Sequence, residues 1–234
     1  MPWAVLCAAG LDPTTQAARP PLQESFADMA PDVTPDTAVF DFGGVLIDWD
    51  PRLLYRRLFD GDEAAVEEFL ATVCTPEWNR CQDAGRSFAE AEAEAIARHP
   101  DKQALITAWL RHFDEMVPGA IEGTVAVLAK LRARGVKLYG LSNWSAETFA
   151  LTRHRFPFLE WFRGIVVSGQ ESLIKPDLRI FALLLERHGI DPARAVFIDD
   201  SPANIAASEQ CGLRGIRFTS PGQLQTDLQA LGML

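Results

Sequence analysis

The stretch VFDFGGVLID, residues 39–48, decides the fold. An apolar run ends at one carboxylate, Asp41, turns through Gly43 and Gly44, and continues as a second apolar run. A continuous apolar segment is typical of a strand in a parallel sheet, because both faces of such a sheet are covered. Ligands bind at the carboxyl ends of such strands, so the stretch predicts an α/β domain with Asp41 in its site.

Four later segments resemble this first strand, which we place at residues 38–42. They lie at residues 136–141, 164–168, 195–199 and 214–218. Helical patterns cover residues 121–134 and 177–188, and Ser201 followed by Pro202 predicts a further helix start with the hydroxyl as N-cap. Strands that alternate with helices predict an α/β fold, in which helices cover both faces of a parallel sheet.

One connection is far longer than the others. Residues 44–118 contain helical patterns but no convincing strand, whereas a whole βαβ unit takes about 30 residues. We therefore expect a helical insertion at residues 49–116, over the edge of the sheet, and a core formed by residues 36–48 and 117–234. Residues 1–35 are expected to be a poorly ordered N-terminal extension.

The composition argues against several function classes. The chain has 234 residues and a net charge of -10, so attraction to nucleic acid or to anionic lipid is not expected. Charged residues interrupt every apolar run, which predicts no membrane span. Four scattered cysteines, at positions 7, 74, 81 and 211, show neither metal nor disulfide spacing and indicate a reducing cytoplasm. The oligomeric state is left open.

Polar residues follow the predicted strands at the edge where α/β sheets bind ligands. They are Asp41, Gly43 and Gly44 after the first strand, Ser142 and Asn143 after the second, Lys175 after the third, and Asp199 and Asp200 after the fourth. Three carboxylates from two strand ends favour a hard cation such as Mg²⁺. A cation or a lysine is also needed to keep them ionised. The combination suits phosphoryl chemistry on a small phosphorylated substrate.

Each residue type has a role in such chemistry. Asp41 is the candidate nucleophile, because carboxylates form aspartyl-phosphate intermediates. The Ser142 hydroxyl, backbone N–H groups and the Lys175 ammonium are expected to hold the phosphoryl oxygens. Gly43 and Gly44 are expected to adopt unusual φ angles and to leave room for metal and phosphate. The predicted substrate-binding residues are Ser142, Asn143, Lys175 and Gly44.

The motifs DFGGVL, LSNWS, IKPD and FIDDSPAN, in this order, resemble the four motifs of the haloacid dehalogenase-like hydrolase superfamily. The resemblance implies a Rossmann-like core, a helical cap inserted after the first strand, and Mg²⁺-dependent hydrolysis through an aspartyl intermediate. It implies metal ligands at Asp41, at the Gly43 carbonyl, at Asp200 and, through water, at Asp199. It also implies that Asp41 is the nucleophile, Ser142 a phosphate contact and Lys175 the stabilising cation.

One position departs from the family pattern. Phosphatases of the superfamily mostly carry a second aspartate two residues after the nucleophile as general acid, and here that position is Gly43. Three explanations stay open: a phosphatase that works with glycine there, a 2-haloacid dehalogenase whose halide needs no protonation, and a weakly active or non-catalytic ligand-binding protein. The pair Asp199 and Asp200 favours the phosphatase, because dehalogenases act without a metal and usually lack this acidic pair.

A replacement proton donor is expected from the inserted segment or from the substrate. Weak candidates by proximity are Asp48, Asp50 and Arg52. The segment PEWNRCQDAG, residues 76–85, is expected to be a polar and aromatic loop that contacts substrate through Asn79 and Asp83, with Trp78 in the core. Asn204, one turn into the helix after the acidic pair, is ambiguous between a supporting role and solvation.

Overall fold

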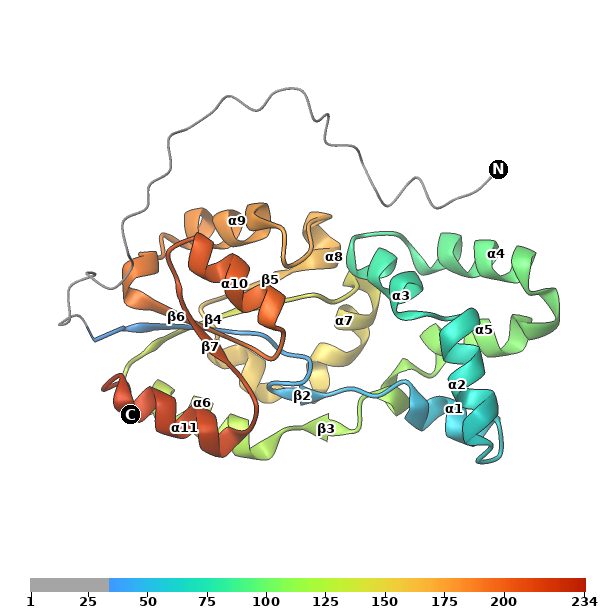
Figure 1. Cartoon of the computed structure of the whole chain (residues 1–234), viewed down its shortest axis with the longest axis horizontal. Coiled ribbons are helices and arrows are strands. Elements are labelled where there is room, and N and C mark those ends of the chain that lie inside the picture. The colour runs from blue at the N-terminus through green and yellow to red at the C-terminus, as the bar shows by residue number, and fades with distance from the viewer. Residues whose placement is uncertain (1–33) are drawn as a thin grey trace, which may run out of the picture. The chain divides into compact units, whose positions relative to one another are not determined.

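A five-stranded parallel sheet forms the core of the computed structural model, which describes residues 34–234 (Figure 1). The strand order is β5-β4-β1-β6-β7, with β1 at Thr37–Phe40, β4 at Lys137–Ser142, β5 at Gly164–Val167, β6 at Ala195–Asp199 and β7 at Arg214–Arg217. The central strand β1 pairs Thr37 with Lys137 on one side and with Ala195 on the other. The predicted α/β class is confirmed, and each predicted strand is present.

Both faces of the sheet are buried, which explains why the strands are continuously apolar. In β1, Val39 packs into one apolar cluster with Phe181, while Phe40 packs into a second cluster with Leu128 and Leu224. The helices α9 (Leu178–His188) and α10 (Pro202–Gln210) cover one face, and α6 (Glu122–Ala133) and α11 (Pro221–Ala230) cover the other (Figure 1). Successive side chains along β1 therefore pack into two apolar clusters, one on each face of the sheet.

Helix α10 begins where the sequence predicts, but its first turn is stabilised differently. Ser201 is the N-cap residue and Pro202 the first helical residue, yet the Ser201 side chain makes no capping hydrogen bond. Instead, the backbone N–H of Ser201 donates to Oδ1 of Asp199, at 2.8 Å. The expected capping role of the Ser201 hydroxyl is wrong, because the buried acid already orders this turn.

The chain between β1 and α6 is a helical segment. Its helices are α1 (Arg52–Leu58), α2 (Glu63–Thr72), α3 (Pro76–Asp83), α4 (Phe88–Arg98) and α5 (Gln103–Arg111). The short strands β2 (Ile47–Asp48) and β3 (Gly119–Ala120) flank this segment and pair with each other in antiparallel fashion. The expectation of no strand in residues 44–118 missed β2, because a strand of two residues has no pattern to detect and its partner is distant in sequence.

Residues 34–234 form one compact unit, which contains both the sheet and the helical segment. Of the predicted N-terminal extension, residues 1–33 lie outside the described residues. Within the described part of the chain, every helix is too short or too polar to cross a membrane.

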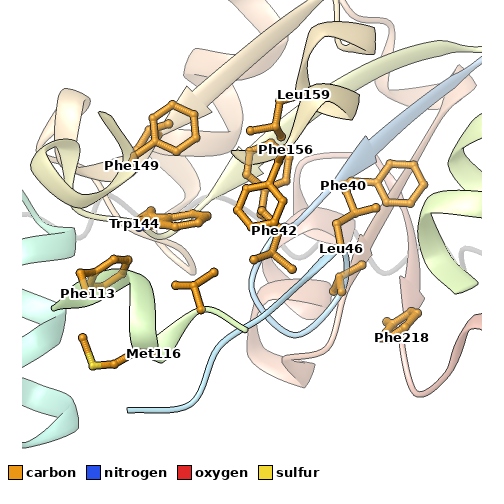
Figure 2. Packing of buried hydrophobic residues seen from close by; sticks show 14 of the residues in the cluster. Phe40, Phe42, Leu46, Phe113, Met116, Trp144, Phe149, Phe156, Leu159 and Phe218 are labelled. Carbon is orange, nitrogen blue, oxygen red and sulfur yellow. The ribbon is translucent and has the colours of Figure 1, made fainter. Parts of the chain in front are cut away.

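Aromatic rings fill the junction between the helical segment and the core (Figure 2). The ring centroids of Phe113 and Trp144 lie 6.3 Å apart, and those of Trp144 and Phe149 lie 5.6 Å apart in a T-shaped arrangement. Phe113 lies in the 3-10 turn that follows α5, Trp144 follows β4, and Phe149 lies in α7 (Ala146–Thr152). On β4, Gly140 leaves space for Phe42, whose ring a Cβ at that position would overlap. The loops after β1 and β4 are therefore fixed by packing.

Candidate active site

The turn after β1 holds Asp41 at the edge of the sheet. The Asp41 N–H donates to the carbonyl of Ile198 in β6, at 2.9 Å, so Asp41 still takes part in the hydrogen bonding of the sheet. Its Oδ1 accepts the N–H of Phe42, at 2.6 Å. The carbonyl of Phe42 accepts the N–H groups of Leu46 and Ile47, both at 2.8 Å, which closes the turn. The backbone itself therefore orients the Asp41 carboxylate.

The two glycines of the turn differ. Gly44 has a φ of +70°, whereas Gly43 does not belong to the glycines with positive φ. A Cβ at Gly44 would lie 2.9 Å from Oδ2 of Asp200, which is too close for a side chain. A Cβ at Gly43 would meet no atom within 4 Å. The expected unusual φ is therefore confirmed at Gly44 and wrong at Gly43, where the missing side chain leaves open space.

Lys175 is the buried cation of the site. Its Nζ lies 3.0 Å from Oδ2 of Asp41 and 2.6 Å from Oδ2 of Asp199. Asn143 fixes the backbone of this lysine, because its side chain accepts the Lys175 N–H at 2.8 Å and donates to the Lys175 carbonyl at 3.0 Å. The lysine thus links the carboxylates at the ends of β1 and β6, where parallel strands place their strand-end residues close together.

Asp199 is fully buried and surrounded by donors. Besides Lys175 and the Ser201 N–H, the Asn204 side chain donates to both of its carboxylate oxygens, each at 3.0 Å. This arrangement fixes the orientation of Asp199, since charge-assisted hydrogen bonds are stronger than neutral ones. The ambiguity over Asn204 is resolved in favour of a supporting role in the site.

The charges of these groups act on one another. Burial raises the pKa of Asp41 above its ordinary value, Lys175 opposes the rise, and Asp199 adds to it. Burial alone would lower the pKa of Lys175, but the carboxylates of Asp41 and Asp199 hold it above its ordinary value. Burial and the neighbouring Asp199 also raise the pKa of Asp200. The lysine alone therefore leaves these carboxylates incompletely neutralised.

The acidic cluster has the composition of a site for a hard cation. Asp41, Asp199 and Asp200 each offer a carboxylate oxygen, and the three oxygens lie within 4.8 Å of one another. Asp200 is the exposed member, so a cation has access from solvent. A divalent cation would lower the pKa values that burial raises. The donor set fits Mg²⁺, which prefers carboxylate oxygens.

A cavity of about 300 Å³ adjoins these carboxylates. Its lining residues from the core are Asp41, Gly43, Gly44, Ile47, Asn143, Trp144, Thr148 and Asp200, and those from the helical segment and its ends are Trp49, Asn79, Asp83 and Phe113. Lys175, Asp199 and Ser142 are almost completely buried and are not lining residues. Of the eight residues predicted at the strand ends, five line the cavity, and Lys175 contacts two of these five, Asp41 and Asn143, from within the core. Thr148 and Phe113 were not identified as lining residues from the sequence, because both lie outside the four motifs.

The segment at residues 76–85 is mostly helical, so the expected loop is wrong. The hydroxyl of Thr75 accepts the N–H of Trp78 at 3.1 Å, and a proline follows as the first helical residue of α3. This N-cap signal outweighs the weak apolar periodicity of the segment. Trp78 is buried as expected, and Asn79 and Asp83 both line the cavity, one turn apart.

The weak donor candidates lie elsewhere. Asp48, Asp50 and Arg52 are not among the described residues that line the cavity. Asp50 accepts the N–H of Arg52 at 2.9 Å, and the Arg52 side chain pairs with Glu67 at 2.5 Å. The Arg52 contact joins the start of α1 to α2, away from the lining of the cavity.

A parallel sheet with a buried lysine between two strand-end aspartates, and with a helical insertion after the first strand, is an arrangement typical of a class of α/β hydrolases. The chain belongs to the haloacid dehalogenase-like hydrolase family, whose model matches residues 35–212. The resemblance drawn from the four motifs and the prediction of a hydrolase are thereby confirmed.

Related proteins include several phosphatases. The chain is 25% identical over 183 residues to the sesquiterpene phosphatase astK of Aspergillus oryzae, covering 78% of this chain and 89% of that protein. It is 25% identical over 211 residues to a phosphoglycolate phosphatase of Rhodospirillum rubrum, covering 86% of each. A solved structure of the HAD family enzyme bt-2542 of Bacteroides thetaiotaomicron, in complex with magnesium and inorganic phosphate, has a TM-score of 0.59 at 24% identity and covers 80% of this chain and 95% of its own. This likeness confirms the Rossmann-like fold.

Proposed function

We propose that the protein is a Mg²⁺-dependent phosphatase that hydrolyses a small phosphorylated metabolite through a phosphoenzyme on Asp41. The observation that carries the proposal is the Lys175 ammonium between Asp41, at 3.0 Å, and Asp199, at 2.6 Å, with Asp200 completing a cluster of three carboxylates. One buried cation beside three carboxylates leaves an excess of negative charge that favours a second cation, and this cation would in turn attract an anionic substrate. The phosphatases among the relatives support the same assignment.

The cluster would hold the metal through Asp41, Asp200 and the Gly43 carbonyl, with Asp199 acting through water. Bound Mg²⁺ supplies positive charge to the phosphoryl oxygens and orients the group for in-line displacement. The magnesium and phosphate bound by the enzyme bt-2542 support this assignment.

The protein residues have separate tasks in the proposed reaction. The Asp41 carboxylate, oriented by the Phe42 N–H, attacks phosphorus, and the Lys175 ammonium stabilises the charge that develops. Ser142 is the proposed phosphate contact. Asn143 positions Lys175, because both polar ends of its side chain are bonded to the lysine backbone.

Gly44 supports the site by leaving space. Its N–H donates to the carbonyl of Ile47 at 2.9 Å, so this donor is engaged within the turn. Its lack of a side chain admits the Asp200 carboxylate. We therefore replace the predicted substrate contact at Gly44 by a role in bringing Asp200 to the cluster.

We assign residues 49–116 the role of a cap that closes the cavity. The cavity volume of about 300 Å³ is at the lower end of the range of roughly 300–1,000 Å³ found for small-molecule sites. Its cap side combines the aromatic rings of Trp49 and Phe113 with the polar side chains of Asn79 and Asp83. This lining suits a small phosphate monoester, whose identity the cap side chains select.

The test is phosphate release from a panel of sugar phosphates, nucleotides and phosphorylated acids, with and without Mg²⁺. We expect Mg²⁺-dependent release by the wild type and none by the Asp41→Asn variant, with the same circular dichroism spectrum for both. Full activity of the variant would contradict the phosphoenzyme. Halide release from 2-chloropropionate with chelator present would instead establish a dehalogenase, and binding without turnover of any ester would establish a ligand-binding protein.

A further inference from the structure

The proposed reaction has no proton donor at Gly43, where the cavity has open space. A Cβ at this position would meet no atom within 4 Å. The oxygen of an alcohol leaves phosphorus slowly unless it is protonated, and a general acid contributes a factor of about 10² to 10⁴. A donor therefore has to reach the cavity from another element.

Asp83 is the carboxyl group that the cap brings to this cavity. Among the described residues that line it, the acids are Asp41, Asp200 and Asp83. Asp41 and Asp200 belong to the cluster proposed to hold the metal, whereas Asp83 is not a member of that cluster. It is the last residue of α3. The cavity is thus shared by a nucleophile from the core and a separate carboxyl group from the cap.

Both the side chain and the backbone of Asp83 are held in place. Asn79 donates to its Oδ2 at 3.2 Å, and the backbone of Ser145 donates to its carboxyl group. Its carbonyl accepts the Ser168 hydroxyl at 2.6 Å, and the same hydroxyl oxygen accepts the Trp144 N–H at 2.9 Å. Ser168 begins α8 (Ser168–Glu171) of the core, so these bonds dock the end of α3 onto the loop after β4.

Two glycines allow close packing at this place, one within the core and one between the cap and the core. A Cβ at Gly169 would lie 2.5 Å from the backbone nitrogen of Ala146 and 2.8 Å from the carbonyl oxygen of Trp144. A Cβ at Gly85, in the turn after α3, would lie 2.8 Å from the hydroxyl of Ser172. Gly85 therefore lets the turn after α3 approach α8 closely, and Gly169 lets α8 pack tightly on the loop after β4, which together hold the end of α3 beside the core.

The surroundings of Asp83 keep a substantial fraction of this carboxyl group protonated near neutral pH. Burial raises the pKa of Asp83 to about 7, while the Ser145 backbone and the Arg80 charge oppose the rise. Charged side chains of the neighbouring elements are paired elsewhere: Glu94 of α4 with Arg86, Glu171 of α8 with Arg187, and Glu147 of α7 with the Phe88 N–H. An acid with a pKa near the working pH both gives and takes a proton efficiently.

We propose that Asp83 is the general acid and then the general base of the reaction, in the place of a side chain at position 43. This inference rests on the proposed phosphatase function. In the first step an Asp41 oxygen bonds to phosphorus, the bond from phosphorus to the leaving oxygen breaks, and the Asp83 carboxyl proton passes to that oxygen. In the second step a water oxygen bonds to phosphorus, the bond to Asp41 breaks, and the Asp83 carboxylate takes a proton from the water. The products are an alcohol and hydrogen phosphate, and both aspartates regain their starting states.

The test compares wild type and Asp83→Asn on two esters with different leaving groups. 2,4-Dinitrophenolate leaves without protonation, whereas benzyl alcohol requires it. We expect kcat/KM for benzyl phosphate to fall about 10²-fold or more in the variant, and kcat/KM for 2,4-dinitrophenyl phosphate to fall less than about 10-fold. An equal loss on both esters would show a merely structural role and overturn the inference. A wild type that releases phosphate neither from these esters nor from any member of the panel above would overturn the phosphatase function itself.

Two further measurements separate chemistry from folding. Glu92→Gln is the matched control, because burial also raises the pKa of Glu92, which lies in α4 and is not a cavity-lining residue. This variant should leave both rates unchanged. In the wild type, kcat/KM for benzyl phosphate should fall as the pH rises through the pKa of Asp83, and this decline should vanish in Asp83→Asn. A variant that keeps the decline would contradict the assignment of the proton to Asp83.

Discussion

Replacing Asp83 by asparagine should stabilise the folded protein at neutral and higher pH, although it slows the proposed reaction. Burial raises the pKa of this carboxyl group to about 7, against 3.8 in the absence of the fold. Between these two pH values the folded chain binds a proton that the unfolded chain has released. The free energy of unfolding of the wild type therefore falls as the pH rises through this window.

The size of the effect follows from the two pKa values. A difference between about 7 and 3.8, at about 1.36 kcal/mol for each pH unit, corresponds to about 4 kcal/mol as an upper value. Asparagine avoids this cost because it does not ionise, and its carbonyl oxygen can still accept the hydrogen bond from Asn79. The advantage of the variant should be near zero at about pH 4, grow up to about pH 7, and stay constant above it.

Urea denaturation of both proteins at several pH values between about 5 and about 8 measures this difference directly. Glu90→Gln supplies a control of opposite sign, because hydrogen bonds from Ser87 lower the pKa of Glu90. That variant should lose stability by the same amount across this range, because the contribution of Glu90 declines only at pH values below the ordinary pKa of a glutamate. A stability difference for Asp83→Asn that is the same at both ends of the pH range would refute the reasoning.

Three further variants test the turn and the ion pairs. Gly44→Ala should destabilise the protein by about 1–3 kcal/mol and weaken Mg²⁺ binding in a titration, because φ is +70° and the new Cβ meets Asp200. Lys175→Met should lower the free energy of unfolding by about 3–5 kcal/mol at pH values where its two partner carboxylates are ionised, as urea denaturation would measure. Adding Gly43→Asp to Asp83→Asn should restore part of the benzyl phosphate hydrolysis, because a side chain at position 43 meets open space; no recovery would argue against that space as a donor position.

The sheet could be predicted from sequence because its signals are local. Val39 and Phe40 point into opposite apolar clusters, so both faces demand apolar residues and the run ends only where the strand reaches Asp41 at the edge. The strand at residues 195–199 ends at Asp199 for the same reason. Strand-end polar residues in such a sheet meet at one edge, which is why the lysine and the acids could be placed together before the structure was known.

The remaining features depend on contacts that no local pattern encodes. Gly43 and Gly44 are the same residue type, and only the bond from the Gly44 N–H to Ile47 shows which of them takes the positive φ. Asp83 could be named as a substrate contact from the sequence, but the only signal for its helix was the N-cap residue Thr75. Its docking on Ser168 joins residues 85 positions apart, so its place at the cavity follows from tertiary packing.

Under the proposal for Asp83, the proton donor belongs to the cap, so the reaction requires the cap to be docked onto the core. Ser168 bonds to the Asp83 carbonyl and to the Trp144 N–H, so one hydroxyl sets the distance between α3 and the loop after β4. Trp144 also packs against Phe113 at the end of the cap (Figure 2). Trp144 and Phe113 line the cavity as well, so the contacts that dock the cap also form the wall beside the proposed proton donor. An aspartate on the turn at Gly43 would keep its place without the cap, whereas Asp83 is in place only when the cap is docked over the substrate.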